Sequence, residues 1–123
     1  VTLALSQSMI PEIVKYDEYL LRAWTAFFVD PEKAWSVEQL ANEAGLSRSA
    51  FYDRFYKAFQ SSPIKTLRRY RLEQAKKMLS NSESPLIEIA EKVGYNSTAA
   101  FVRAFKKAFG DTPQVWRHRK ANN

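Results

Sequence analysis

The chain has 123 residues, of which 46% are hydrophobic and 14% aromatic, so it can bury a core and is not expected to be disordered. Three glycines and five prolines leave little room for a loop-rich or β-sandwich architecture. The absence of cysteine excludes disulfides, thiolate zinc sites and cysteine nucleophiles. No segment approaches the roughly 18 consecutive apolar residues that a membrane-spanning helix needs.

The net charge of +6 is unevenly distributed along the chain. Residues 1–47 carry three basic and seven acidic side chains, whereas residues 48–123 carry sixteen basic and six acidic ones. An excess of positive charge in one part of a chain is typical of proteins that bind a polyanion. A solvated, lysine-rich surface is the alternative interpretation.

Apolar periodicity predicts an all-α protein with seven helices and no strand. Residues that favour helix ends bound most of these helices, as the capping-box pair Ser36 and Gln39 does for the second. The first helix is predicted from a stripe formed by Tyr16, Tyr19, Leu20, Ala23, Trp24, Phe27 and Phe28. The predicted helices cover about 12–29, 37–44, 48–59 and 63–80, a segment from Ser84-Pro85 to Gly94, about 97–109, and a short segment from Thr112-Pro113 that contains Trp116.

One segment of the chain occurs twice. Residues 50–63 reappear as residues 100–113 at an offset of 50, and the helix and turn before each copy also match, residues 40–45 with residues 89–94. That upstream part is offset by 49, so the second turn has one extra residue. Each copy therefore predicts a helix-turn-helix lobe, and a long linker helix joins the two. The expected division is a tail at 1–11, a first lobe at 12–61, a linker helix at 62–81, a second lobe at 82–119 and a tail at 120–123.

The phenylalanines of each repeated helix recur on one side and are expected to face the core. The apolar sides carry Phe51, Phe55, Ala58 and Phe59, and Phe101, Phe105, Ala108 and Phe109. At about 100° per residue, the opposite faces carry Ser49, Asp53, Tyr56 and Lys57 in the first copy, and Ala99, Arg103, Lys106 and Lys107 in the second. Tyr52, Arg54, Thr98 and Val102 flank these outward faces.

Two such helices in a basic chain favour binding to double-stranded DNA. A recognition helix places its N-terminal half on base edges in the major groove and its far end near phosphates. The base-contacting candidates are Ser49, Tyr52, Asp53, Thr98, Ala99 and Arg103. The backbone-contacting candidates are Ser36, Arg48, Arg54, Lys57, Ser84, Ser97, Lys106 and Lys107. Arg103 is the strongest candidate, because its guanidinium fork matches guanine O6 and N7; a solvated or phosphate-contacting arginine is the alternative.

Asp53 occupies the position in the first copy that Arg103 occupies in the second. Phosphates repel a carboxylate there unless it accepts from cytosine N4, and pairing with Lys57 four residues later is the alternative. The first lobe is therefore expected to contribute less sequence readout than the second. Ser36 and Ser84 are expected to cap helices, with their helix N-termini offered to phosphates or with the caps purely structural.

Residues 40–51, 71–79, 89–95, 101–106 and 112–117 together resemble the DNA-binding domain of AraC/XylS-type transcription regulators, a likeness that covers about residues 17–119. The resemblance implies two helix-turn-helix lobes in adjacent major grooves of one duplex, and a bacterial, cytoplasmic transcription factor. Three residues depart from the family pattern: Asp53 replaces a frequent arginine, Gln60 replaces the glycine that Gly110 retains, and Trp116 replaces a tyrosine or phenylalanine.

Double-stranded DNA is the expected partner, with RNA polymerase as a second candidate. No cofactor, metal, membrane or enzymatic activity is expected, since His118 is the single histidine and no phosphate loop or nucleophile arrangement occurs. The alternatives are a helical protein-interaction module and a non-specific nucleic-acid-binding module. The resemblance also implies an upstream effector-binding domain; because the chain begins at Val1, we expect an excised C-terminal domain that lacks it, with a small stand-alone regulator as the alternative. The oligomeric state stays open.

Overall fold

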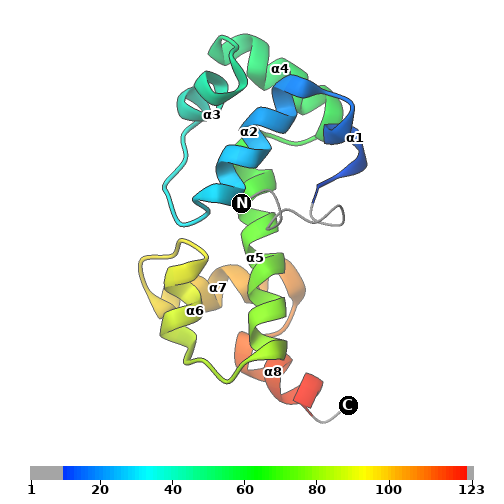
Figure 1. Ribbon diagram of the computed structural model, residues 1–123. Helices are drawn as coiled ribbons and strands as arrows, with labels where there is room; N and C mark the ends of the chain where they lie inside the picture. The colour runs from blue at the N-terminus through cyan, green and yellow to red at the C-terminus, as the bar shows by residue number, and fades with distance from the viewer. Residues whose placement is uncertain (1–9, 122–123) are drawn as a thin grey trace. The chain divides into compact units, whose positions relative to one another are not determined.

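The computed structural model describes residues 10–121, which form helices and connecting turns without any strand (Figure 1). The all-α prediction is therefore confirmed for this part of the chain. The chain divides into two compact units, Val1–Thr66 and Leu67–Asn123. The helices of the described residues are α1 (Glu12–Lys15), α2 (Glu18–Val29), α3 (Val37–Ala44), α4 (Arg48–Phe59), α5 (Pro63–Asn81), α6 (Leu86–Lys92), α7 (Thr98–Phe109) and α8 (Pro113–Ala121).

The first unit is built around α2, which packs against α1, α3 and α4. Aromatic rings fill much of its interior, and the ring of Trp24 stacks on that of Phe59 from α4 with centroids 5.5 Å apart. The buried hydrophobic residues of this unit are Val14, Leu20, Ala23, Trp24, Phe27, Leu40, Ala41, Ala44, Phe51 and Phe55. This packing fixes one face of α4 against the core.

The prediction of a single helix over 12–29 was wrong, because the chain breaks between α1 and α2. Asp17 has an extended backbone, and its side chain accepts hydrogen bonds from the backbone N–H groups of Tyr19 and Leu20. Aspartate is a favoured helix N-cap, so a new helix begins there. Tyr16 lies at the break and is 86% exposed, so it does not belong to the predicted apolar stripe. The break gives eight helices in the described residues rather than the predicted seven.

Local capping explains the bounds of α3 and α4. Ser36 and Gln39 form the predicted capping box, in which each side chain bonds the other residue's backbone N–H. Gly45 has a left-handed backbone and ends α3, and Ser47 then caps α4 through the backbone N–H of Ala50. The short connection between the two helices is the predicted turn of a helix-turn-helix.

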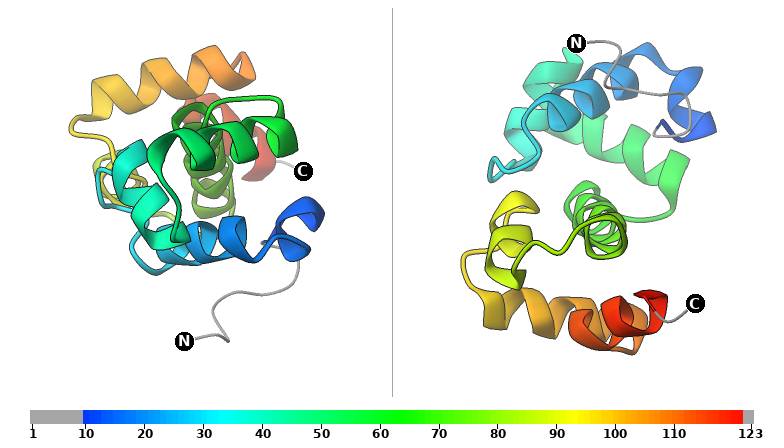
Figure 2. Two further views of the ribbon diagram at one scale, coloured as in Figure 1. Left: turned by 90° about the horizontal axis from the view of Figure 1, so that it is seen from above. Right: turned by 60° about the horizontal axis from the view of Figure 1, so that its bottom comes forward.

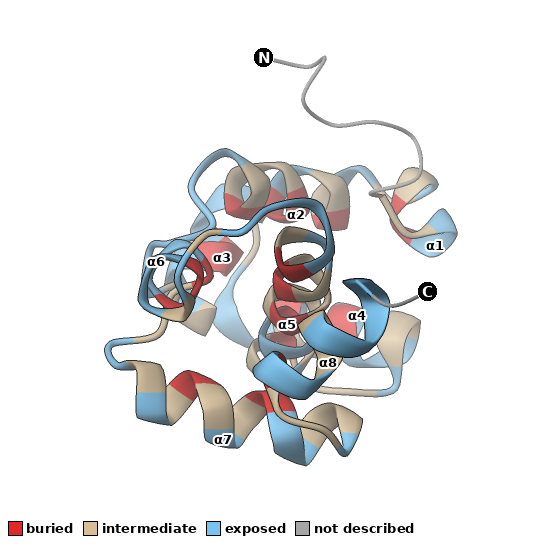
Figure 3. Ribbon diagram, turned by 90° about the horizontal axis from the view of Figure 1, so that it is seen from below, coloured by how far each residue is buried: buried red, intermediate tan, exposed pale blue. Residues whose placement is uncertain are grey.

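The second unit surrounds the C-terminal part of α5 with α6, α7 and α8 (Figure 2). Its buried core comes from α5, α6, α7 and the residue that follows α6. The core residues are Leu72, Ala75, Leu79, Ile89, Ala90, Val93, Phe101 and Phe105. Trp116 of α8 packs against this core at its edge. Figure 3 shows the consequence for α7, which carries buried residues along one side and exposed residues along the other.

Helix α5 contributes to both units. It begins at Pro63 after Ser62, whose hydroxyl accepts a hydrogen bond from the backbone N–H of Lys65, as expected for an N-cap followed by proline. Its first four residues fall within the first unit, and from Leu67 onward it supplies core residues to the second. At the other end of the second unit, Thr112 caps α8, which continues to Ala121.

The predicted cap at Ser84 was wrong. Helix α6 begins one residue later than expected, with Pro85 as its N-cap residue, and no side chain caps it. The Ser84 hydroxyl instead lies 3.3 Å from that of Ser82. Proline at the N-cap carries no hydroxyl or carboxylate, so the first N–H groups of α6 have no side-chain acceptor of this kind.

Candidate nucleic-acid interface

The two repeated helices, α4 and α7, are anchored in the same way. Phe51 and Phe55 of α4 are 0% and 3% exposed, and Phe101 and Phe105 of α7 are both 0% exposed. The ring centroids within each pair lie 5.8 Å apart. Because a helix with one face buried must turn the other to solvent, these rings determine which residues of α4 and α7 point outward.

The predicted outward faces are confirmed as exposed surface. Every residue placed on them is exposed: Ser49, Asp53, Tyr56 and Lys57 on α4, and Ala99, Arg103, Lys106 and Lys107 on α7. The flanking residues Tyr52, Thr98 and Val102 are partly buried, and Arg54 is exposed. Each unit therefore presents a continuous helical surface of the kind that enters a major groove.

All the charged residues on the outward face of α7 are cationic. This face carries Arg103, Lys106 and Lys107, and α7 contains no acidic residue. Within residues 10–121, none of these three cations forms an ion pair. Three unneutralised charges on one exposed helix face produce a local positive potential that attracts anions such as the phosphates of nucleic acid.

On α4, by contrast, both arginines are engaged by acidic residues of neighbouring helices. The guanidinium Nε of Arg48 donates to Glu38 Oε2 of α3 at 3.0 Å. That of Arg54 donates to Asp17 Oδ2, which precedes α2, at 2.6 Å. These two pairs were missed by sequence reasoning, since the partners lie 10 and 37 residues apart and no local spacing connects them.

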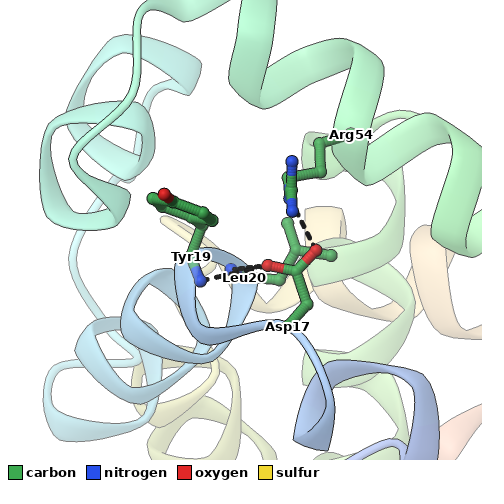
Figure 4. Close-up of polar contacts among 4 residues, drawn as sticks. All are labelled: Asp17, Tyr19, Leu20 and Arg54. Atoms are coloured by element: carbon green, nitrogen blue, oxygen red, sulfur yellow. Dashed lines mark hydrogen bonds and ion pairs between the residues drawn. The ribbon is translucent and has the colours of Figure 1, made fainter.

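The Arg54 side chain is held on two sides (Figure 4). Its guanidinium carbon lies 4.8 Å from the centre of the Tyr19 ring, in addition to the ion pair with Asp17. Asp17 is only 17% exposed at its side chain, whereas Arg54 is 47% exposed. Arg54 thus keeps an accessible edge, but its charge is largely balanced by a carboxylate of its own unit.

Asp53 of α4 lies in a shallow hollow of about 320 Å³ with Tyr52, Tyr56 and Lys57. The rings of Tyr52 and Tyr56 are nearly parallel, with an interplanar angle of 15° and centroids 6.2 Å apart. The predicted alternative of an Asp53–Lys57 ion pair is not found among the described side chains. The carboxylate of Asp53 is therefore exposed and has no cationic partner among residues 10–121.

The serine candidates differ in what their hydroxyls do. Ser36 and Ser97 accept hydrogen bonds from the backbone N–H groups of Gln39 and Ala100, so each serves as an N-cap and retains its own O–H as a donor. Ser49 and Ser84 cap no helix; Ser49 lies within the first turn of α4. The capping serines thus sit where free N–H groups favour an anion.

A second basic feature lies between α5 and α7 in the second unit. A groove of about 610 Å³ is lined by the cations Arg68, Arg69 and Lys107 together with Leu72, Tyr95, Ala104 and Ala108. Burial raises the pKa of the Tyr95 hydroxyl, an effect that the nearby positive charges of Arg68 and Arg71 partly offset. Burial likewise lowers the pKa of the Arg71 guanidinium, which packs against Gly94 with its Cζ 3.3 Å from the position a Cβ would take. Burial also raises the pKa of Tyr70.

None of the helices in the described part of the chain is long and apolar enough to cross a membrane.

Two helix-turn-helix units, each with an exposed second helix, define a double helix-turn-helix protein. A family model described as a helix-turn-helix domain matches residues 40–119. The chain is 39% identical over 98 residues to the HTH-type transcriptional regulator AlkR of Acinetobacter baylyi, an alignment that covers 80% of this chain and 32% of that protein. It is 40% identical over 89 residues to the RCS-specific transcriptional activator RclR of Escherichia coli, covering 72% of this chain and 31% of that protein.

Solved structures share the fold. The DNA-binding domain of AdpA, determined in complex with a target DNA, superposes with a TM-score of 0.78 at 26% identity, covering 86% of this chain and 95% of that one. An AraC-type regulator from Chromobacterium violaceum superposes with the same TM-score of 0.78 at 23% identity, covering 84% and 92%. The chain belongs to the helix-turn-helix family and, within it, to the AraC/XylS-type DNA-binding domains. It spans about a third of the length of the curated relatives it matches.

Proposed function

We propose that this chain binds double-stranded DNA in a sequence-specific manner and thereby regulates transcription, with α4 and α7 as recognition helices in adjacent major grooves. The observation that carries the proposal is the outward face of α7, where Arg103, Lys106 and Lys107 are exposed and unpaired within the described residues. A helix of this kind, following a short turn in a helix-turn-helix unit, is the element that enters the major groove.

The residues of α7 divide into two roles by their place along the helix. Arg103 lies in the second turn and is proposed to donate both arms of its guanidinium to guanine O6 and N7. Thr98 and Ala99, in the first turn, are proposed to contact neighbouring base edges. Lys106 and Lys107, in the last turn, are proposed to contact phosphates, as is Ser97 at the N-cap.

The first unit is proposed to bind DNA through the corresponding face of α4, with fewer unpaired cations. Ser49, Tyr52 and Asp53 lie in the N-terminal half of α4 and are its base-contacting candidates. The proposed backbone contacts are Ser36, Arg48, Arg54 and Lys57, with Ser84 in the second unit. Lys57 is the one cation in the last turn of α4, whereas Arg48 and Arg54 already have acidic partners.

Further proposals follow from the length of the relatives. Since this chain matches only about a third of AlkR and RclR, we infer that it acts with an upstream effector-binding domain. A regulator of this class works beside RNA polymerase on the chromosome, so RNA polymerase is a proposed partner and the bacterial cytoplasm the proposed location. The alternatives are a protein-interaction module and a non-specific nucleic-acid-binding module. Selection of bound duplexes distinguishes both from a sequence-specific regulator.

Selection of bound duplexes from a random pool tests the proposal directly. We expect one sequence to be enriched, with two protected segments whose centres lie about 10 base pairs apart, one helical turn. That duplex should compete about a thousandfold better than random duplex, and its affinity should fall steeply with salt. Equal affinity for all duplexes would contradict the proposal and indicate a non-specific nucleic-acid-binding module. Absence of binding to any duplex would indicate a protein-interaction module.

A further inference from the structure

The outward faces of α4 and α7 differ in charge, although their buried faces match. At equivalent positions, α4 presents Tyr52 and Asp53 where α7 presents Val102 and Arg103, and Tyr56 where α7 presents Lys106. The repeat keeps the phenylalanines and the lysine at positions 57 and 107, but the residues that would face base edges differ. The two helices are therefore built for different kinds of contact.

Nonspecific attraction to phosphates is weak on α4. Its two arginines are paired with Glu38 and Asp17, which cancels most of their charge at long range. Lys57 is the only cation of α4 without an acidic partner in the described residues, and Asp53 opposes it. Whatever binding α4 contributes must come from short-range contacts to particular groups.

The carboxylate of Asp53 restricts which group that is. An ionised carboxylate offers only hydrogen-bond acceptors, so it needs a donor on the base edge. In the major groove only cytosine N4 and adenine N6 are donors, and adenine places the N7 acceptor beside N6. That N7 repels a carboxylate, whereas cytosine presents no acceptor of its own on this edge. Cytosine is therefore the base that Asp53 fits.

The surroundings of Asp53 support such a contact. The rings of Tyr52 and Tyr56 are stacked, and both residues line the same hollow as Asp53. Lys57, one turn further along, borders the same hollow and can offset repulsion between the carboxylate and the nearest phosphate. Because Asp53 forms no ion pair with any residue that the structure describes, a contact with a base would break none of the observed ion pairs.

We propose that the first unit makes recognition depend on a cytosine, read through the carboxylate of Asp53, and that it contributes selectivity more than affinity. This inference rests on the proposed function, since it assigns a base to one of the two recognition helices. In this arrangement α7 holds the duplex through its free cations, and α4 rejects duplexes that lack the C·G pair at the position that Asp53 meets.

The test compares the unsubstituted chain with D53N and D53A in selections from the same random duplex pool. Affinities are then measured on variants of the selected duplex in which each position carries each of the four base pairs in turn. Unsubstituted protein should prefer C·G at one position of the first half-site by about tenfold. D53A should lose that preference and bind random duplex more tightly, because a repulsive charge is gone. D53N should move the preference toward adenine, which an amide reads through N6 and N7.

R103A provides the control for the proposed function itself. It should weaken discrimination in the second half-site and leave the cytosine preference in the first. If the unsubstituted chain selects a sequence but D53N and D53A select the same one, the inference is overturned while the proposed function stands. If the unsubstituted chain selects nothing, the proposed function fails as well. Thermal unfolding of each variant establishes that the exposed substitutions leave the fold intact.

Discussion

Arg54 and Asp17 connect the outward helix of the first unit to the start of α2: the Arg54 Nε lies 2.6 Å from Asp17 Oδ2, while Asp17 Oδ1 accepts the backbone N–H groups of Tyr19 and Leu20. One carboxylate thus caps a helix and neutralises a candidate DNA contact (Figure 4). Because the Asp17 side chain is mostly buried, the charged hydrogen bond is less exposed to solvent than a typical surface pair.

Substitution of Asp17 should separate these two roles. D17A removes both the cap and the ion pair, and we expect it to lower the free energy of unfolding by about 1–2 kcal/mol. D17N keeps an oxygen for the cap and loses only the charge, so its loss should be about half or less. Urea titration, monitored by tryptophan fluorescence, measures the free energy of unfolding of both variants. Equal losses for the two variants would mean that the cap contributes nothing.

Glu38 should limit the attraction of Arg48 to DNA. In E38Q, Arg48 loses its acidic partner, so the protein should bind a duplex more tightly. The slope of log K against log salt should become steeper by up to the amount expected for about one additional phosphate contact. E43Q is the matched control, because Glu43 is an exposed acid of the same helix that pairs with no described residue. If E38Q and E43Q tighten binding equally, the effect comes from net charge, and the ion pair between Glu38 and Arg48 does not limit DNA binding.

Gln60 stores backbone strain at the end of α4. It has a φ of 57°, in the left-handed region, at the position where Gly110 ends α7 with a φ of 86°. Its backbone N–H still bonds Tyr56 O at 2.7 Å, as that of Gly110 bonds Lys106 O, so the turn is preserved despite the side chain. The two helix ends thus share the closing hydrogen bond, and they differ in that Gln60 carries a side chain at a positive φ.

Substitutions at Gln60 and Gly110 should therefore change the free energy of unfolding in opposite directions. We expect Q60G to raise the free energy of unfolding by about 0.5–1 kcal/mol and G110Q to lower it by about 1 kcal/mol, because only glycine adopts a positive φ without strain. Space is not the cause at Gly110, since a Cβ there would meet no atom within 4 Å. Chemical denaturation of both variants checks this, and a destabilised Q60G would contradict it. Such a result would show that the Gln60 side-chain bond to Lys57 O outweighs the strain.

The phenylalanine anchor of α7 should be essential to its unit. Phe105 is fully buried among core residues of the second unit, so F105A is expected to cost about 3–5 kcal/mol of unfolding free energy. K106A is the control, because it alters an exposed residue of the same helix and should change stability by less than about 0.5 kcal/mol. Similar losses for both would contradict the assignment of faces.

Much of this fold could be predicted because its determinants are local. The capping box at Ser36 and Gln39 and the spacing of the phenylalanines are set by residues within about one helical turn of each other, and both predictions are confirmed. The break at Asp17 was missed because apolar periodicity continues across it, although an aspartate followed by Glu18 is itself a signal for a helix start.

The electrostatics of the candidate interface could not be predicted in the same way. Arg54 and Asp17 lie 37 residues apart in the sequence and meet only because α2 packs against α4. The sequence therefore indicated which residues point outward but not that Arg48 and Arg54 are already paired. The assignment of particular residues to bases or phosphates stays a prediction, and its strongest element is Arg103.

The most direct test of the central claim, that α7 reads sequence through Arg103 and holds phosphates through its last turn, is a comparison of R103A with K107A. Both are measured on the selected duplex and its single-pair variants over a series of salt concentrations. We expect R103A to lose about 1–3 kcal/mol on the selected duplex and its preference at one base pair. K107A should lose less, equally on all duplexes, with a shallower salt slope. A uniform loss with unchanged base preference in R103A would contradict the claim and leave Arg103 as a phosphate contact.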